Sequence, residues 1–263
     1  NQAVAARRAG AEVVFLTAFG DDALAPAIRR HDEDEGIDLT YAKTVPGATS
    51  GVALIFIAED GENLIGIAMG ANAHLKPEDI DALPESVFDP RGVLLASLEV
   101  PIETVVRAVE RAHARGVTVV VNPAPGDGRL ATLGALPKVD VLTPNESEAE
   151  VLTGRHLDDP GAAADALRAQ GVKSVVMTLG GKGCLVVDND GRTPIPARKV
   201  EVVDTVGAGD AFSAALAVAL SEGRPLREAA GWAVAAAAIA VTKPGAQGAL
   251  PTREAIDGLA SRR

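Results

Sequence analysis

Residues 93–122 read VLLASLEVPIETVVRAVERAHARGVTVVVN, with an apolar run at each end and a helical pattern over 101–115 between them. The alternation continues with VDVLT, helical patterns over 145–153 and 158–170, then SVVMTL and GCLVV. Continuous apolar strands that alternate with helices are typical of a parallel sheet covered by helices on both faces. The sequence therefore predicts an α/β fold, a three-layer sandwich around a mostly parallel central sheet.

The N-terminal third departs from this alternation. Its pattern predicts a helix over 1–10, a buried strand over 12–20 (EVVFLTAFG) and a helix over 21–36, with Asp at its start and Gly36 at its end. Three strand-like runs follow, DLTYAKTV, GVALIFIAED and ENLIGIAM. The second and third alternate partially and flank a short turn that contains Asp-Gly, which favours a hairpin. We therefore expect a small β lid around 38–70 beside the main sheet.

The C-terminal third predicts helices near 208–222, 225–242 and 252–261. Hydrophobic residues make up 47% of the chain, which is enough for a sizeable core. Because no internal repeat or low-complexity linker interrupts the pattern, residues 1–263 are expected to form a single main domain.

The composition of the chain argues against nucleic acid and membranes as partners. The chain carries 25 Lys and Arg residues against 36 Asp and Glu residues, a net charge of −11, and its aromatic content is 3%. An acidic chain with few aromatic rings lacks the basic surface and the stacking platforms that nucleic-acid binding uses. The longest alanine-rich apolar run, 229–242, is too short and too weakly hydrophobic to span a bilayer. We therefore expect neither a nucleic-acid nor a membrane partner.

The single cysteine, Cys184, excludes an internal disulfide and favours a reducing, cytoplasmic setting. Its flanks, LGGKGCLVV, have strand character and contain no neighbouring base, so a buried inert thiol is expected. The four histidines are scattered and pair with no cysteine or suitably spaced acid. The chemistry of this chain is therefore expected to depend on other residues.

The segment with the clearest chemistry lies near the C-terminus. Residues 200–203 (VEVV) predict a strand, and DTVGAGDAFSAALAVAL after them predicts a glycine-rich turn and a helix that begins near Ala208. Backbone N–H groups at a helix start carry the positive end of the helix dipole, and Gly207 and Gly209 leave room for an anion to approach them. A carboxylate such as Asp210 is unfavourable beside a phosphate unless it accepts a proton from the attacking hydroxyl. Phosphoryl transfer to an alcohol explains these residues, and so does a tight turn followed by a helix-start acid.

Other nucleotide motifs do not match. The dinucleotide fingerprint requires GxGxxG, but residues 207–212 read GAGDAF, with Phe212 at the third glycine position. The P-loop requires GxxxxGK followed by Ser or Thr, whereas Gly181-Lys182 is followed by Gly183. The protein-kinase motifs are absent as well. A nicotinamide-dependent oxidoreductase is therefore disfavoured.

Two further segments favour a nucleotide site. In TPNESEAEVLTG (143–154), Asn145 and Glu148 lie one helical turn apart, which suits a hydrated divalent cation near phosphates. A helix cap with acids that favour the dipole explains the same pair. TLGGKG (178–183) follows a strand and could lie against a nucleotide, although a simple hairpin turn explains it equally well.

Taken together and in this order, the three segments resemble the ribokinase family of sugar kinases. DTVGAGDAF is similar to the C-terminal signature of the family, and NESE to its N-x-x-E magnesium motif. The stretches GVALIFIAEDGENLIGIAMGANAHL, SLEVPIE, NPAP and AAAAIAVTKPGAQGALP are also similar to segments of the family. The resemblance covers the whole chain, and it implies an α/β kinase fold with a β lid.

The resemblance also implies roles for individual residues. Asp210 would be the catalytic base that takes the proton from the O5 hydroxyl of the sugar, beside an anion hole formed by Gly207, Ala208 and Gly209. Asn1, Glu99 and Asp210 match sugar-binding positions. Glu148 matches the position that organises Mg²⁺. The ATP-binding positions are Asn145, Thr178, Gly180, Gly183, Gly209 and Val234.

A monovalent-cation site, with K⁺ as activator, is implied beside the anion hole. Two departures from the family occur there: Ala249 stands where a hydroxyl residue is common, and Pro244 replaces a second basic residue. Backbone carbonyl ligands would preserve such a site, whereas a required hydroxyl would weaken it. The matching positions are Asp204, Val206, Ala240, Lys243, Gly245 and Ala249.

The activity implied by the resemblance is phosphorylation of D-ribose at O5 by ATP, with Mg²⁺ and K⁺ as cofactors. Related kinases of 2-deoxyribose, ketoses or nucleosides remain alternatives, as does a non-catalytic remnant that only binds nucleotide. The lids of the family often pair between two subunits, so a homodimer is expected. Family members carry about forty residues before the position of Asn1, so we also expect this sequence to begin within a longer protein.

Overall fold

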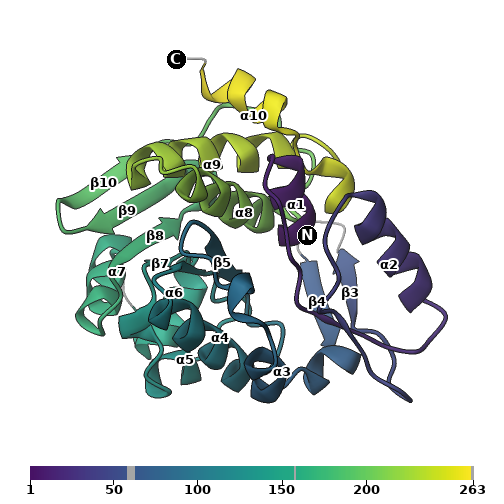
Figure 1. Ribbon diagram of the computed structural model, residues 1–263. Helices are drawn as coiled ribbons and strands as arrows, with labels where there is room; N and C mark the ends of the chain where they lie inside the picture. Colours follow the sequence, from purple (N-terminus) through teal and green to yellow (C-terminus); the bar gives the residue numbers. More distant parts are fainter. Residues whose placement is uncertain (58–62, 157, 262–263) are drawn as a thin grey trace.

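The computed structural model describes residues 1–57, 63–156 and 158–261, and a six-stranded sheet lies at its centre (Figure 1). The strand order is β10-β9-β8-β7-β6-β5. Strands β5 to β8 run parallel, whereas β9 pairs antiparallel with both β8 and β10. The predicted mostly parallel sheet is confirmed. The strands are β5 (Val93–Ala96), β6 (Thr118–Val121), β7 (Val141–Leu142), β8 (Ser174–Thr178), β9 (Cys184–Asp188) and β10 (Gly191–Ile195).

Helices cover both faces of this sheet. In β6, Val119 and Val121 belong to a core cluster shared with three helices on one face, and Val120 belongs to a second cluster with three other helices on the opposite face, as the two-residue period of a strand requires. The first set is α4 (Ile102–Ala114), α6 (Glu146–Thr153) and α7 (Pro160–Ala169); the second is α8 (Ala208–Ser221), α9 (Leu226–Ala240) and α10 (Arg253–Ala260). The predicted three-layer sandwich and its helices are therefore confirmed.

Helices α8 and α9 form an alanine-rich layer between the sheet and α10. The buried residues of both helices are mostly alanine, so their backbones approach each other closely. This layer sets the height of α8 above the sheet, and the first turn of α8 carries the candidate catalytic acid. Its buried alanines are Ala211, Ala214, Ala215, Ala217, Ala219, Ala229, Ala230, Ala233, Ala235, Ala236, Ala238 and Ala240.

The N-terminal elements lie beside α8. Helix α1 (Gln2–Arg8) packs against α8, and α2 (Ala25–Asp34) follows it along the chain. The carboxylate of Asp22 accepts hydrogen bonds from the first N–H groups of α2, and Gly36 lies just beyond the end of the helix with a φ of +79°. Both predicted helices are confirmed.

The buried strand predicted over 12–20 and the strand predicted over 38–45 are wrong in extent. Only β1 (Ala18–Phe19) and β2 (Lys43–Thr44) are regular, and they pair parallel with each other. Val14 makes one further bridge to Asp38, but its side chain is 49% exposed. Among the described residues, the 12–20 segment has backbone partners along one edge only, so it cannot form a strand buried within the sheet.

The predicted hairpin is confirmed as a separate two-stranded sheet (Figure 1). Strands β3 (Val52–Ile57) and β4 (Asn63–Ala68) run antiparallel, and the Asp-Gly turn between them falls outside the described residues. The side chains of Leu54 and Ile67 are 58% and 54% exposed, so part of the hairpin presents apolar surface to solvent.

Cys184 is buried in β9, where burial raises the pKa of its thiol to about 12, so the thiol stays protonated near neutral pH. None of the helices among the described residues combines the length and the hydrophobicity that a bilayer-spanning helix needs. The short elements are η1 (Gly70–His74), α3 (Pro77–Asp81), η2 (Glu85–Val87), α5 (Arg129–Thr132), η3 (Leu136–Lys138), η4 (Gly180–Lys182) and η5 (Gln247–Ala249).

Candidate active site

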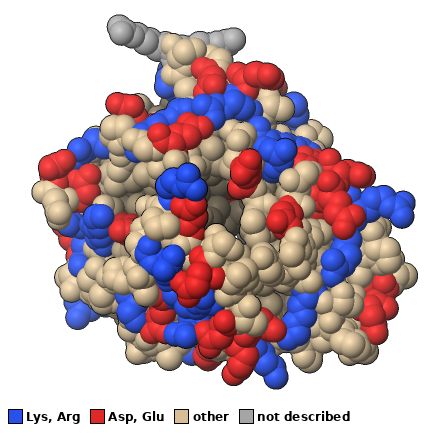
Figure 2. All heavy atoms as spheres, in the orientation of Figure 1, with Lys and Arg blue, Asp and Glu red and all other residues tan. Residues whose placement is uncertain are grey.

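The parallel strands of the sheet end at a common edge, where α/β proteins bind their ligands. Glu99 follows β5, Asn122 directly follows β6, Asn145 follows β7, and Thr178 ends β8. Residues far apart in the sequence are thereby brought to one edge of the sheet. Figure 2 shows a hollow near the middle of the molecule with Asp and Glu side chains around its rim.

The start of α8 leaves backbone donors free. Gly207 precedes the helix with a φ of +78°, a conformation that disfavours other residues, and a Cβ there would lie 3.3 Å from Ala246 Cα. A Cβ on Gly209 would have no neighbour within 4 Å, so the backbone there is open on that side. No described residue accepts a hydrogen bond from the N–H of Gly207, Gly209 or Asp210, whereas the N–H of Ala208 bonds to Thr205 at 3.3 Å. These free donors can receive an anion.

The strand predicted over 200–203 is wrong. These residues are irregular, and Val202 and Val203 are exposed. The N–H of Val203 bonds to the carbonyl of Val241, 2.8 Å away, so the segment is tied to the end of α9 and does not join the sheet. The helix predicted to begin near Ala208 is nevertheless present.

Asp210 lies in the first turn of α8 and receives hydrogen bonds from α1 and the residue before it. Asn1 Nδ2 donates to Oδ2 at 2.9 Å, and Gln2 Nε2 donates to Oδ1 at 3.1 Å. Gln2 Nε2 also donates to Asn122 Oδ1 at 2.9 Å. Asn1 and Asp210, two of the predicted sugar-binding positions, are therefore brought together. Gln2 and Asn122 were not among the predicted site residues.

Glu99 faces the same region with a perturbed carboxyl group. Although its side chain keeps contact with solvent, partial desolvation raises the pKa of Glu99, and the negative charge of Asp210 raises it further. The second effect requires the two carboxyl groups to be close enough to interact. A second carboxyl group, that of Glu99, therefore lies near the candidate base.

Asn145 and Glu148 bind each other at the start of α6. Asn145 Oδ1 accepts from the N–H of Glu148 at 2.8 Å, and Glu148 Oε2 accepts from the N–H of Asn145 at 2.9 Å. The Asn145 amide also donates to Glu148 Oε1 at 3.0 Å. Burial raises the pKa of Glu148, and the backbone hydrogen bond from Asn145 acts in the opposite direction. This is a capping box, so the alternative interpretation of the pair as a helix cap describes its observed contacts.

The other predicted ATP-binding positions lie on β8, on the turn after it and on α9. Thr178 forms a bridge with Asn145, which joins the ends of β7 and β8. Gly180 opens the η4 turn with a φ of +53° and free space around it, whereas a Cβ on Gly183 would lie 2.1 Å from the carbonyl of Ile195. Val234 is buried in α9, in the same core cluster as Phe212 of α8.

The predicted monovalent-cation positions come from the loop before α8 and from the end of α9 with the loop after it, and these two segments meet beside α8. Asp204 Oδ1 accepts from the N–H of Val206 at 3.0 Å, and Oδ2 accepts from the N–H of Gly245 at 2.8 Å. These two backbone donors hold the pKa of Asp204 below its usual range. No described residue donates to the carbonyls of the other five positions. The carbonyls are those of Val206, Ala240, Lys243, Gly245 and Ala249.

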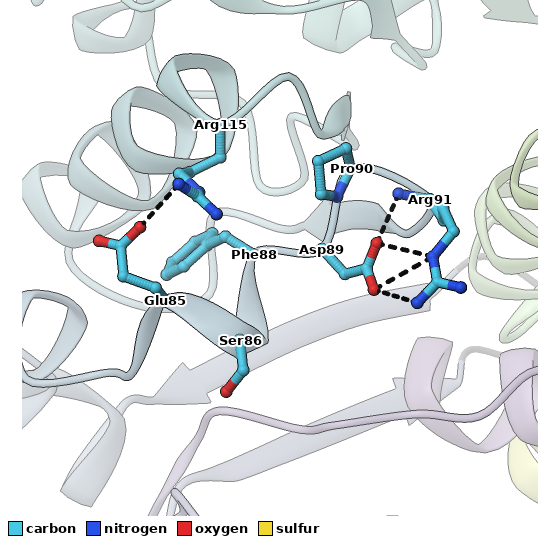
Figure 3. Close-up of a pocket in the computed structure, with 7 residues that line it drawn as sticks. All are labelled: Glu85, Ser86, Phe88, Asp89, Pro90, Arg91 and Arg115. Carbon is cyan, nitrogen blue, oxygen red and sulfur yellow. Dashed lines mark hydrogen bonds and ion pairs between the residues drawn. The ribbon is translucent and has the colours of Figure 1, made fainter.

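A surface hollow of about 350 Å³ lies elsewhere, around η2 (Figure 3). Its charged side chains pair locally, since Arg115 bonds to Glu85 and Arg91 to Asp89. None of the predicted site residues lines it. The arrangement indicates a set of solvated ion pairs and not a second ligand site.

Comparison with known proteins identifies the class. Residues 1–253 match the pfkB family of carbohydrate kinases, so the chain belongs to this family and is a carbohydrate kinase. It is 39% identical to a ribokinase of Haemophilus influenzae and 40% identical to a deoxyribokinase of Salmonella typhi, over 257 residues that cover 97% of this chain and 83% of each relative. The structure of an Arabidopsis thaliana ribokinase complexed with ribose and ATP superposes with a TM-score of 0.86 at 29% identity, covering 100% of this chain and 86% of that chain. The resemblance to the ribokinase family is confirmed.

Proposed function

We propose that this carbohydrate kinase transfers the γ-phosphoryl group of ATP to O5 of D-ribose. The observation that carries the proposal is the first turn of α8, where the Asp210 carboxylate lies beside free backbone N–H groups. A base and an anion site within one helical turn are the two groups that phosphoryl transfer to an alcohol requires.

Different residues of the chain accept the proton, stabilise the transferring group and bind the two substrates. Asp210 accepts the proton of the O5 hydroxyl as O5 forms a bond to the γ-phosphorus and the bond to the β-γ bridging oxygen breaks. The N–H groups of the 207–210 turn stabilise the negative charge on the transferring group. Asn1 and Glu99 orient the sugar. Asn145, Thr178, Gly180, Gly183, Gly209 and Val234 bind ATP.

Two relatives support the choice of ribose, namely the Haemophilus ribokinase and the plant ribokinase whose structure contains ribose and ATP. 2-Deoxy-D-ribose is the second candidate, because the identity to the Salmonella deoxyribokinase is 40% against 39%. The two sugars differ only at the 2-hydroxyl, so discrimination depends on whether a protein group pairs with that hydroxyl.

The test is a steady-state assay of ADP release with D-ribose, 2-deoxy-D-ribose, D-fructose and adenosine. We expect the highest kcat/KM for ribose, with ³¹P and ¹³C NMR locating the new phosphate on carbon 5. A higher value for deoxyribose would select the second candidate. Absence of turnover with every acceptor, together with measurable ATP binding, would select the non-catalytic alternative.

The residues at the start of α6 fit a magnesium site. Glu148 supplies a carboxylate, Asn145 supplies an amide oxygen, and Mg²⁺ commonly binds one or two carboxylates while it keeps several waters and substrate phosphates. When bound, Mg²⁺ would neutralise charge on the phosphates of ATP. Glu148 and Asn145 would orient the hydration shell of the ion.

The loops beside α8 fit a potassium site. Their unpaired carbonyls and the Asp204 carboxylate are oxygen donors of the kind that a large monovalent cation prefers. Backbone carbonyls at Ala249 and its neighbours would not need the side-chain hydroxyl that Ala249 lacks. When bound, K⁺ would add positive charge next to the anion-binding turn.

We also propose that two copies of the chain pair through the β3–β4 lid in the cytoplasm. The exposed apolar side chains of Val52 and Leu54, which lie on the same face of the hairpin, support this, because their burial would be favourable. Sedimentation equilibrium of the protein and of a Val52→Ser, Leu54→Ser double variant tests it. We expect a dimer that the substitutions weaken, and a monomer in both would contradict the proposal.

A further inference from the structure

Asp210 belongs to a closed ring of hydrogen bonds that begins and ends on α8. Gln2 Nε2 donates to Asp210 Oδ1 and to Asn122 Oδ1, and Asn122 Nδ2 donates to the carbonyl of Thr143 at 3.0 Å. The hydroxyls of Thr143 and Ser213 are 3.2 Å apart. Ser213 lies one helical turn after Asp210. The ring therefore ties the carboxylate to the ends of β6 and β7.

The ring fixes the direction of each amide. Asn122 is 7% exposed and Thr143 is 1% exposed, so water cannot readily replace a lost partner. A rotation of the Asn122 amide would place its oxygen against the Thr143 carbonyl, which is unfavourable because both are acceptors. With its nitrogen held there, Asn122 presents Oδ1 to Gln2. Gln2 must then place its NH₂ group between two acceptors, Asn122 Oδ1 and Asp210 Oδ1.

We propose that Gln2 and Asn122 are positioning residues for the reaction of this kinase. Gln2 holds Oδ1 of Asp210, which orients the carboxylate, and Asn122 acts through Gln2 by fixing the direction of its amide. The inference rests on the proposed role of Asp210 as base.

The two anchors of Asp210 differ in permanence. Asn1, which donates to Oδ2, is also a proposed sugar contact, so sugar binding would compete for its amide. Gln2 has both hydrogens of Nε2 committed within the protein. Gln2 therefore keeps the carboxylate in place while Oδ2 turns to the sugar hydroxyl.

The test is a double-mutant cycle with Gln2→Met and Asn122→Leu, in which each substitution keeps side-chain volume and removes hydrogen bonding. We expect Gln2→Met to lower kcat by about ten- to a hundred-fold, the range for a lost hydrogen bond to a charged group, with the KM for ATP unchanged. Asn122→Leu should lower kcat less. Because Asn122 acts through Gln2, the double variant should be no slower than Gln2→Met alone. Fully additive losses, or a normal kcat in Gln2→Met, would overturn the inference.

A merely structural role would give a different pattern. Thr104→Val is the matched control, since the buried Thr104 hydroxyl donates to the carbonyl of Leu75 at 2.8 Å and lies in another part of the fold. It should lower the melting temperature without changing kcat. If Gln2→Met does not fold, Gln2→Glu keeps the shape, replaces the donor by an acceptor and should also lower kcat. Gln2→Asn, too short to reach both acceptors, should not restore activity.

The comparison with Asp210→Asn separates this inference from the proposed function. If Asp210→Asn keeps its activity, the base assignment is wrong and Gln2 has no base to position. If Asp210→Asn loses turnover while Gln2→Met retains it, the base assignment stands and the positioning role is wrong.

Discussion

The sequences of helices α6 and α8 begin with a similar pattern, but the acids in their first turns make different contacts. Each carries an acid at its third helical position, Glu148 in α6 and Asp210 in α8. Glu148 turns back and caps its own helix together with Asn145. Asp210 accepts hydrogen bonds from Asn1 and Gln2, and the glycines before it provide no cap.

The difference lies in the residue that precedes each helix. The side chain of Asn145 accepts from one of the first N–H groups of α6, that of Glu148, and the Glu148 carboxylate in turn accepts from the N–H of Asn145. Gly207 has no side chain, so the N–H groups of Gly209 and Asp210 have no acceptor among the described residues, and the Asp210 carboxylate does not cap its own helix. A helix start that lacks a cap is less stable, but its unpaired N–H groups remain available to bind an anion.

The largest expected effect concerns the acid of the uncapped helix. Asp210→Asn should keep the fold and ATP binding but lower kcat by about 10²–10⁴-fold, because the amide cannot accept the proton of the sugar hydroxyl. Measurement of ADP release and of the melting temperature checks this. A kcat within a few-fold of the parent protein would show that the contrast between the two acids has no catalytic meaning.

Substitutions at the two glycines before Asp210 should affect different properties, one the activity and the other the stability. A Cβ on Gly209 enters open space, so Gly209→Ala should leave the melting temperature unchanged or higher, yet lower kcat by about ten- to a hundred-fold by misplacing the phosphoryl group. Gly207→Ala should instead destabilise the fold by about 1–2 kcal/mol, because φ is +78° there. Thermal melts and kcat of both variants provide the check. Full activity in Gly209→Ala would contradict the anion hole.

A smaller effect, on the Mg²⁺ requirement, is expected from substitution of Glu148 at the start of the capped helix α6. Glu148→Gln keeps an acceptor for the N–H of Asn145 but removes the charge, so α6 should stay intact while the Mg²⁺ concentration for half-maximal activity rises about ten-fold. Activity measured against Mg²⁺ at fixed ATP tests this. Thr252→Ala, which removes the cap of α10, is the control that should alter stability only. An unchanged Mg²⁺ requirement in Glu148→Gln would leave Glu148 as a cap alone.

Replacement of sodium by potassium should raise activity several-fold, because the larger ion suits a cage of loop carbonyls next to the α8 turn. A titration of K⁺ into a potassium-free buffer of constant ionic strength measures this. If rates are equal throughout, the two loops do not tune the uncapped helix, and Ala249 is the first position to examine.

The smallest effect concerns Asp204, which fastens those loops. Its folded-state pKa is lowered, so its contribution to stability is complete above the unfolded value of about 3.9 and disappears as the pH falls through the folded value. Asp204→Asn should therefore melt slightly below the parent at pH 7, and the gap should shrink at pH 3. A gap that grows on acidification would contradict this sign.

Sequence patterns predicted the elements that bury a continuous face. Runs such as VTVVV, and the helices between them, have only one way to hide their apolar side chains. The patterns failed where neighbours decide the outcome. Among the described residues, the 12–20 segment has a strand partner along one edge only, and residues 200–203 have none. Gln2 and Asn122 were missed for a related reason. Their roles depend on a contact across 120 residues, and no local spacing encodes it.

The alanine-rich layer formed by α8 and α9 limits which substitutions this sequence can accept during evolution. Valine or leucine at a buried position such as Ala215 or Ala233 would be overpacked, at a cost of about 1–3 kcal/mol, and would lift Asp210 away from Gln2. A lineage can therefore exchange exposed residues of α9 and α10 freely, while α8 and its contact face on α9 accept few replacements besides glycine and serine. Deep mutational scanning under growth selection would reveal a stripe of intolerance that follows helix packing and includes buried alanines to which no substrate contact is assigned.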